Sequence, residues 1–374
     1  MDLKIKNTIK FFNPEGYVKT SKKDQCAFPN NLEYIDCSLG VNPFGYSNNI
    51  YSFNKENSFE KFNVSNYPEF PYLNLKNEIV KYWSNHCKLN DSNIKFGTGS
   101  IGILLNINRI FIENKTKVLG IGPTFTPYSS DVKLCEGIFD HVLLNENEKF
   151  KFNVDKFTPR ITPEYTLIYI DNPNNPTGQV INIEDIKQIV VKAREKDICV
   201  VIDEAYGDFM DNCNSAVNIV NDFENLMVVR TFSKGLGLAG LRVGYMITST
   251  YLSEIYSKVD VPFTLNNIGY NAAIASLVDK DFILDSRKKI NVIKQEVRET
   301  FQRIKVLETN NDVPIMTLEF PNKDIDLFNI FRFNGVLTES GKDFAGLGKN
   351  FIRMRVPNSS FELSKIIKNI EKSI

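Results

Sequence analysis

The middle of the chain alternates between short apolar stretches and longer stretches in which apolar residues recur at helical spacing. Helical segments at 73–87 and 183–197 carry their apolar residues along one face. Several of the short stretches are apolar at nearly every position, which is typical of strands buried on both faces of a parallel sheet. Strands that alternate with helices predict a βαβ architecture and an α/β fold. The predicted strands lie at 93–96, 117–122, 137–144, 166–171, 198–203, 226–232 and 242–249.

The two ends of the chain differ from this middle part. Residues 1–66 are rich in Asn, Phe and Lys with weak periodicity, so we expect an irregular arm. After about residue 265 the pattern becomes a long helix at 282–306, then short strands and a last helix. We therefore predict an N-terminal arm that forms part of a smaller domain, a large α/β domain and a small C-terminal α+β domain, at 1–50, 51–268 and 269–374.

The composition argues against partners that need a basic or an apolar surface. Among 374 residues, 45 Lys and Arg balance 45 Asp and Glu, so nothing indicates binding to nucleic acid or to a membrane surface. No apolar run approaches the roughly 18 residues of a membrane-spanning helix, and the first residues are too polar for a secretory signal. The six cysteines lack disulfide-like spacing and predict reduced thiols, and two histidines are too few for a histidine-rich metal site. We expect a cytoplasmic protein that holds no metal.

Two glycine-rich turns match the pattern G-x-G-x-x-G, GTGSIG at 97–102 and GLGLAG at 235–240. A dinucleotide site needs an acidic residue about 20 positions further on, and neither turn has one in a suitable place. The first turn follows a predicted strand and opens a predicted helix, where free backbone N–H groups suit a phosphate. Its candidate phosphate-binding residues are Gly99, Ser100 and Ile101.

Three polar segments each follow a predicted parallel strand. They read DNPNNPTG at 171–178, DEAYGDF at 203–209 and TFSKGLGLAGLR at 231–242. Because α/β sheets bind ligands at the carboxyl ends of their strands, we expect these segments to meet at one site. Together they supply acids, an amide, a phenol, a lysine, hydroxyls and an arginine.

In this order and at this spacing, the segments resemble those of pyridoxal-phosphate enzymes of fold type I, in the class I/II aminotransferase group. The most similar branch holds the histidinol-phosphate aminotransferases and threonine-phosphate decarboxylases. The resemblance runs from about residue 36 to the C-terminus and implies a mostly parallel seven-stranded sheet flanked by helices, with a smaller α+β domain. Supporting stretches are SLGVNPFG (38–45), NYPEFPYLNLKNEIVKYW (66–83), GTGS (97–100), PTFTPY (123–128) and GLGKNFIRMRV (346–356).

The resemblance implies a catalytic role for three residues. Lys234 would form the Schiff base with pyridoxal phosphate and then act as a general base on the substrate. Asp203 would keep the pyridine nitrogen protonated, and Tyr206, together with Asn175, would hydrogen-bond the phenolic oxygen of the cofactor. Phe125 would stack on the ring.

The resemblance also implies how the phosphate and the substrate are bound. The cofactor phosphate would be held by Ser233, Arg242 and the first turn, with a further hydroxyl from Thr231. Tyr67 would reach the phosphate of the neighbouring subunit, which implies a homodimer with shared active sites. Arg353 would bind the substrate carboxylate, with Arg355 as a rival on the same strand face. Further substrate contacts are expected at Gly40 and Asn42.

Two departures from the family pattern bear on the substrate. Ile101 and Gly102 stand where relatives often carry an acidic pair. Glu339 aligns with an arginine that lies near the substrate phosphate in the family, although a register error of one or two residues would remove this match. A carboxylate there predicts a substrate without a phosphate, with a cationic or polar side chain.

The function that we predict is a pyridoxal-phosphate aminotransferase that moves the amino group of an α-amino acid to a keto acid. The alternative is an amino-acid decarboxylase with the same site, since the bond that breaks depends on geometry that the sequence does not give. A third reading is a catalytically silent binding module on this fold. The joint presence of Lys234, Asp203, Tyr206 and Arg242 argues against it.

Overall fold

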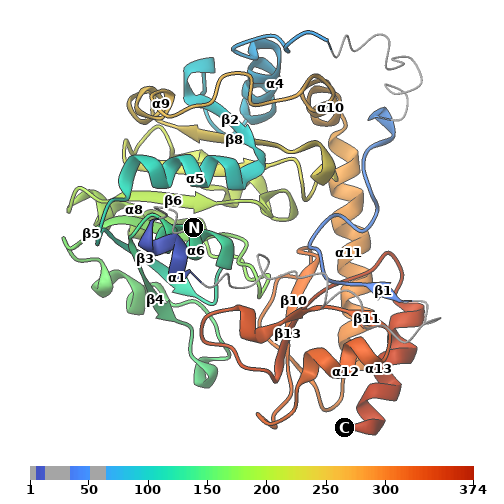
Figure 1. The fold of residues 1–374 in the computed structure, drawn as a ribbon. Helices are drawn as coiled ribbons and strands as arrows, with labels where there is room; N and C mark the ends of the chain where they lie inside the picture. The colour runs from blue at the N-terminus through green and yellow to red at the C-terminus, as the bar shows by residue number, and fades with distance from the viewer. Residues whose placement is uncertain (1–5, 13–33, 51–64) are drawn as a thin grey trace, which may run out of the picture.

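The computed structural model describes residues 6–12, 34–50 and 65–374, and its centre is a sheet of seven strands (Figure 1). The strands are β2 (Ile94–Thr98), β3 (Lys117–Gly122), β4 (Ile138–Leu143), β5 (Tyr165–Asp171), β6 (Cys199–Asp203), β7 (Leu226–Thr231) and β8 (Val243–Thr248). Their order in the sheet is β2-β8-β7-β6-β5-β3-β4. Strands β3 to β7 run parallel, while β8 runs antiparallel to both of its neighbours. The prediction of a mostly parallel seven-stranded sheet is therefore confirmed.

Helices cover both faces of this sheet because alternate strand residues point to opposite sides. In β5, Ile168 and Ile170 join one core cluster, and Leu167 and Tyr169 join the other. The first cluster packs against α4 (Leu73–Trp83), α8 (Ile183–Arg194) and α10 (Asn267–Val278). The second packs against α5 (Gly99–Phe111), α6 (Thr126–Leu134) and α9 (Thr250–Ser257). The sheet is thus the middle of three layers.

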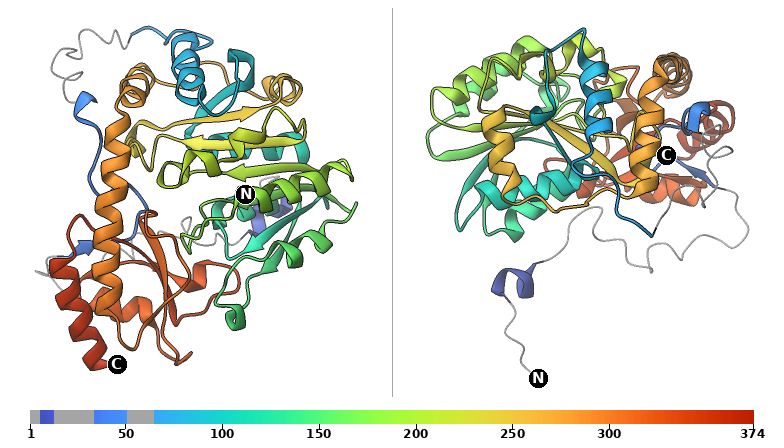
Figure 2. Two further views of the ribbon diagram at one scale, coloured as in Figure 1. Left: turned by 180° about the vertical axis from the view of Figure 1, so that it is seen from behind. Right: turned by 90° about the horizontal axis from the view of Figure 1, so that it is seen from above.

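The C-terminal part adds a second sheet with its own core. Its strands, in the order β12-β13-β10-β9, are antiparallel. Helix α11 (Lys280–Thr300) runs along both parts of the molecule (Figure 2). Strand β1 (Ile35–Asp36) pairs with β11 (Val336–Leu337), so the segment near residue 35 joins this C-terminal part. The remaining elements are β9 (Lys305–Val306), β10 (Ile315–Glu319), α12 (Leu327–Phe333), β12 (Glu339–Ser340), β13 (Phe351–Arg355) and α13 (Phe361–Ser373).

A buried lysine of α11 holds the loop that leads into β10. Lys294 Nζ lies 2.7 to 2.8 Å from four oxygen atoms of this loop, one hydroxyl and three carbonyls. The oxygens belong to Thr309, Asn310, Val313 and Ile315. Since the side chain is fully buried, its amine takes the place of water as the hydrogen-bond donor to these groups.

Parts of the predicted arm, residues 1–5, 13–33 and 51–64, lie outside the described residues. Helix α1 (Asn7–Phe11) contacts α6. Helix α10 packs on α4 and on the core of the large sheet. The predicted boundary after residue 268 would instead assign most of α10 to the smaller domain. The domain boundaries stay a prediction. In the described part of the chain, no helix is long and apolar enough to cross a membrane, and no group of His, Cys, Asp or Glu is placed to hold a metal ion.

Candidate active site

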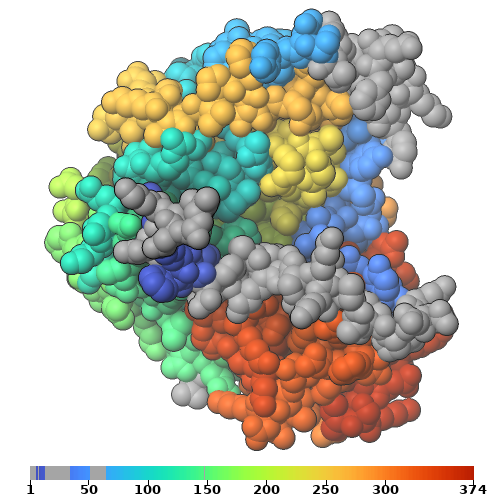
Figure 3. All heavy atoms as spheres, viewed as in Figure 1, coloured from blue at the N-terminus to red at the C-terminus, as the bar shows by residue number. Residues whose placement is uncertain are grey.

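The segments that follow β5, β6 and β7 line one cavity of about 370 Å³, a volume typical of small-molecule sites. The space-filling view shows the surface hollowed beside the yellow segment that follows β7 (Figure 3). Gly40 also lines the cavity. Most residues expected to hold a cofactor are brought together there: Ser100, Ile101, Phe125, Asn175, Asp203, Tyr206, Thr231, Ser233, Lys234 and Arg242.

Lys234 presents an amine with an unusual proton affinity. Burial lowers its pKa from 10.5 to about 8, and the positive charge of Arg242 acts in the same direction, while Asp203 opposes both. Its Nζ lies 5.4 Å from the centre of the Tyr206 ring. A pKa of about 8 leaves a useful fraction of free amine near neutral pH, which a nucleophile or a general base requires.

Asp203 ends β6 inside the cavity wall, where burial raises the pKa of its carboxyl to about 7. One oxygen accepts a hydrogen bond from the Tyr169 hydroxyl at 2.9 Å, and the other accepts one from the Ala205 N–H at 3.0 Å. A buried carboxylate is stabilised by a cation beside it. The position therefore fits a protonated ring nitrogen.

Sequence reasoning missed two residues that shape this wall. Tyr169 is fully buried, stacks on Tyr128 with ring centroids 3.8 Å apart, and donates to Asp203. Asp171 accepts hydrogen bonds from the Thr124 hydroxyl at 2.7 Å and the Asn175 N–H at 2.8 Å, and so fixes the turn after β5. A tyrosine and an acid at the end of an apolar strand were the available signals.

Two hydroxyls and a guanidinium form a group of contacts in the cavity that Lys234 also lines. The Thr231 hydroxyl donates to Ser233 Oγ at 2.9 Å, and Arg242 Nη1 donates to the same oxygen at 3.4 Å. Hydroxyl donors around a guanidinium suit the oxygens of a phosphate.

The start of α5 completes this group. Its N-cap residue, Thr98, makes no side-chain cap hydrogen bond, and Ser100 and Ile101 in the first turn line the cavity. The Gly99 N–H donates to the Arg242 carbonyl at 3.0 Å, so Gly99 positions the turn. Gly99 has φ +72°, and a Cβ on it would lie 2.7 Å from the Arg242 guanidinium. The close approach of the two segments therefore requires glycine.

Arg353 lies beneath the cavity and contacts its lining. This fully buried side chain donates from Nη1 to Asn175 Oδ1 at 3.0 Å and from Nη2 to the Ser38 carbonyl at 2.5 Å. Its rival Arg355 donates to the backbone carbonyls of Val356 and Asp36. Of the two arginines, Arg353 is therefore the one with a hydrogen bond to a cavity-lining side chain.

Glu339 lies next to Arg353 and is not among the residues that line the cavity. The two residues are opposite each other in the antiparallel pairing of β12 and β13, with Glu339 Oε1 3.5 Å from Arg353 Nη2. Burial raises the pKa of Glu339 to about 8, and the charges of Asp343 and Asp36 act in the same direction. Burial lowers the pKa of Arg353 to about 9, and the charge of Arg355 acts in the same direction. When Glu339 is ionised, its carboxylate offsets the charge of the arginine expected to bind the substrate.

Two further expected site residues lie outside the cavity. Asn42 is buried, and its Nδ2 donates to the Gly235 carbonyl at 2.8 Å, so it holds the turn after Lys234. Tyr67 is 76% exposed, stacks on Phe263 and lines a shallow surface pocket that also includes Arg242. The structure of one chain leaves Tyr67 available to a second chain.

Sequence comparison relates the chain to one enzyme family. The family model "Aminotransferase class I and II" matches residues 34–365. A histidinol-phosphate aminotransferase of Methanococcus aeolicus is 28% identical over 382 residues, which cover 100% of this chain and 99% of the relative. One of Caldanaerobacter subterraneus is 33% identical over 310 residues, which cover 80% of this chain and 82% of the relative.

Solved structures share the fold. A histidinol-phosphate aminotransferase of Sinorhizobium meliloti in complex with pyridoxal-5'-phosphate superposes with a TM-score of 0.82 at 18% identity, covering 100% of this chain and 99% of that chain. Thermus thermophilus aspartate aminotransferase with maleate gives a TM-score of 0.85 at 16% identity, covering all of both chains.

Proposed function

The chain belongs to the class I and II aminotransferase family, and from this premise we propose that the cavity beside Lys234 is where it binds pyridoxal phosphate and transfers an amino group. The observation that carries the proposal is the meeting of three groups in one cavity. These are a lysine amine whose pKa is about 8, a buried carboxylate at Asp203, and the anion-binding group of Ser233 and Arg242.

These residues fit the cofactor by their chemistry. Pyridoxal phosphate, when bound, supplies the electron-withdrawing ring that makes the bonds at the substrate Cα labile. Lys234 would be the covalent attachment point and would carry the proton at Cα, since its amine is half neutral near pH 8. Asp203 would keep a proton on the ring nitrogen, and Phe125 would pack against the ring face. Arg242 and Ser233 would hold the phosphate.

Two substrate classes have support. The relatives carry the name histidinol-phosphate aminotransferase, which favours an amino compound with a phosphate. The Glu339 carboxylate, 3.5 Å from Arg353, favours an unphosphorylated amino acid with a cationic or polar side chain. A phosphate carries close to two negative charges at neutral pH, and Glu339 would repel it when ionised, above its pKa of about 8.

A substrate panel separates these classes. Wild type and Glu339→Gln would be assayed with histidinol phosphate and with amino acids that have cationic, polar and apolar side chains. Preference of the wild type for an unphosphorylated substrate, weakened in Glu339→Gln, supports the Glu339 argument. Efficient turnover of histidinol phosphate by the wild type overturns it. Release of CO₂ without formation of the keto acid would support the decarboxylase alternative.

A homodimer with shared sites is part of the proposal, as is a cytoplasmic location. Support for the dimer comes from Tyr67, exposed beside the pocket that contains Arg242. Mixing Lys234→Ala chains with Tyr67→Ala chains should restore part of the activity, because hybrid dimers contain one intact site. Hybrids that form but stay inactive would make Tyr67 a structural residue. The five cysteines of the described residues are free thiols, in keeping with a reducing compartment.

A further inference from the structure

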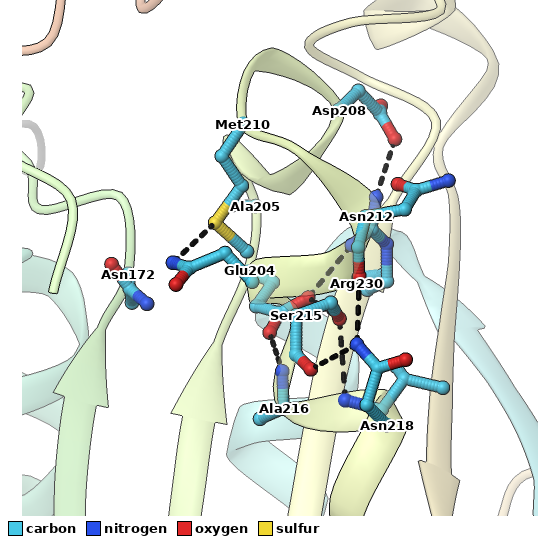
Figure 4. A network of polar contacts seen from close by, with 12 residues as sticks. Asn172, Glu204, Ala205, Asp208, Met210, Asn212, Ser215, Ala216, Asn218 and Arg230 are labelled. Carbon is cyan, nitrogen blue, oxygen red and sulfur yellow. Dashed lines mark hydrogen bonds and ion pairs between the residues drawn. The ribbon is translucent and has the colours of Figure 1, made fainter. Parts of the chain in front are cut away.

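A buried ionic network joins β7 to the segment that follows β6 (Figure 4). Arg230 is 2% exposed and donates from Nη1 to Glu204 Oε2 at 2.7 Å and from Nη2 to Asp208 Oδ1 at 2.6 Å. The Trp83 ring covers the guanidinium, with its centre 4.9 Å from Cζ. One arginine therefore holds two carboxylates that come from the segment next to Asp203.

The network is held firmly at its Glu204 end. Glu204 accepts hydrogen bonds from the Ser215 hydroxyl at 2.6 Å and the Ala216 N–H at 2.7 Å (Figure 4). Burial raises the pKa of Glu204 and of Asp208, and the charge of Arg230 opposes this rise in both. A buried ion pair that is fully hydrogen-bonded resists displacement, because moving one partner leaves the other uncompensated.

At its other end the network touches the lysine turn. Gly235 directly follows Lys234, and a Cβ on Gly235 would lie only 2.3 Å from the Cβ of Asp208. The carbonyl of Gly235 accepts a hydrogen bond from Asn42 at 2.8 Å. The backbone that follows Lys234 thus lies between Asp208 and the Asn42 amide.

We propose that Asp208, held by Arg230, is a positioning residue that fixes the backbone at Lys234 and thereby the place of its amine relative to Asp203. The inference rests on the proposed role of Lys234. The charges that act on the Lys234 amine are those of Arg242 and Asp203, so Asp208 acts through backbone contact. Loosening this contact should misplace the amine without changing its proton affinity, and a misplacement of about 1 Å costs up to roughly a hundredfold in rate.

The test compares Asp208→Ala with a matched control, Glu371→Ala. Asp208 and Glu371 are both 8% exposed, so the two variants each remove a buried carboxylate. Glu371 accepts hydrogen bonds from the backbone N–H groups of 302–304, in the C-terminal part that contains the second sheet. Four quantities would be measured: thermal stability, kcat, KM, and the rate at which pyridoxal phosphate with cyanoborohydride labels Lys234 in cofactor-free protein across pH.

The expected result is a selective loss at the lysine. Asp208→Ala should lower kcat and the labelling rate at Lys234 about tenfold or more, with KM and the pH midpoint of labelling little changed. Glu371→Ala should lose comparable thermal stability and keep kcat within about twofold. An Asp208→Ala variant that keeps kcat within twofold of wild type, or whose kcat falls no more than that of Glu371→Ala, overturns the inference.

A second variant approaches the same contact from the other side. Gly235→Ala introduces a methyl group into the space that Asp208 occupies, so it should reproduce the selective loss even if Asp208→Ala does not fold. A folded Gly235→Ala protein with wild-type kcat would also overturn the inference. Failure of the wild type itself to take the label at Lys234 would instead refute the proposed function.

Discussion

Gly40 is a position where one added methyl group should disable the site. A Cβ on Gly40 would lie 1.8 Å from the Tyr206 hydroxyl oxygen and 2.8 Å from the ring carbon that carries it. Ordinary contact begins at 3.4 Å, so the hydroxyl would have to move by about 1.6 Å. Tyr206 is 3% exposed and cannot turn out into solvent. A displacement of this size at a group that we propose to contact the cofactor should lower kcat roughly a hundredfold.

The assay is steady-state kcat with the best amino donor, with thermal unfolding as a check that the variant folds. Gly240→Ala is the matched control, because a Cβ on Gly240 meets no atom within 4 Å in a turn of the same segment as Lys234. We expect Gly240→Ala to keep kcat within about twofold of wild type. A Gly40→Ala enzyme within threefold of this control would refute the assignment of Tyr206 to the site.

Three further outcomes follow from buried charges. Asp203→Asn should lower kcat by about a thousandfold or more, because the ring nitrogen loses its anionic partner, and a variant within tenfold of wild type would contradict the role. Folded Lys234 loses its proton near pH 8 and the unfolded chain near pH 10.4, so wild type gains stability as pH rises between these values. Lys234→Met should therefore raise the melting temperature of cofactor-free protein at pH 7 and lose that advantage by pH 10.5; an advantage that is constant with pH would argue against the lowered pKa. Lys294→Met should cost roughly 3 kcal/mol in urea unfolding, because four oxygen atoms of 309–315 lose their donor, whereas a cost under about 1 kcal/mol would show that water replaces it.

The large sheet could be predicted from the sequence because its signal is local. Each predicted strand corresponds to an observed strand within about two residues. An uninterrupted apolar run causes the strand to be buried on both faces, and the same run can be read directly from the sequence. The C-terminal end of a helix was harder to predict. The predicted helix at 282–306 stops at Thr300, where Phe301 adopts an extended conformation. The apolar spacing that predicted this helix continues beyond Thr300, so it did not mark the residue at which the helix ends.

The cavity lining could be predicted because strand ends gather at one edge of a sheet. Contacts between distant segments could not. The pairing of Glu339 with Arg353 depends on the register of β12 and β13, and the bond from Asn42 to the lysine turn joins residues that are 193 positions apart. Arg230 did leave a signal, a charge inside the buried strand LMVVRTF, which requires a buried partner.

Covalent labelling tests the central claim most directly. The wild-type protein would be incubated with pyridoxal phosphate, reduced with borohydride, digested and mapped by mass spectrometry. The account predicts the pyridoxyl group on the peptide that contains Lys234, and no stoichiometric label in Lys234→Ala. A label placed mainly on any other lysine, or an equal label in Lys234→Ala, would contradict it.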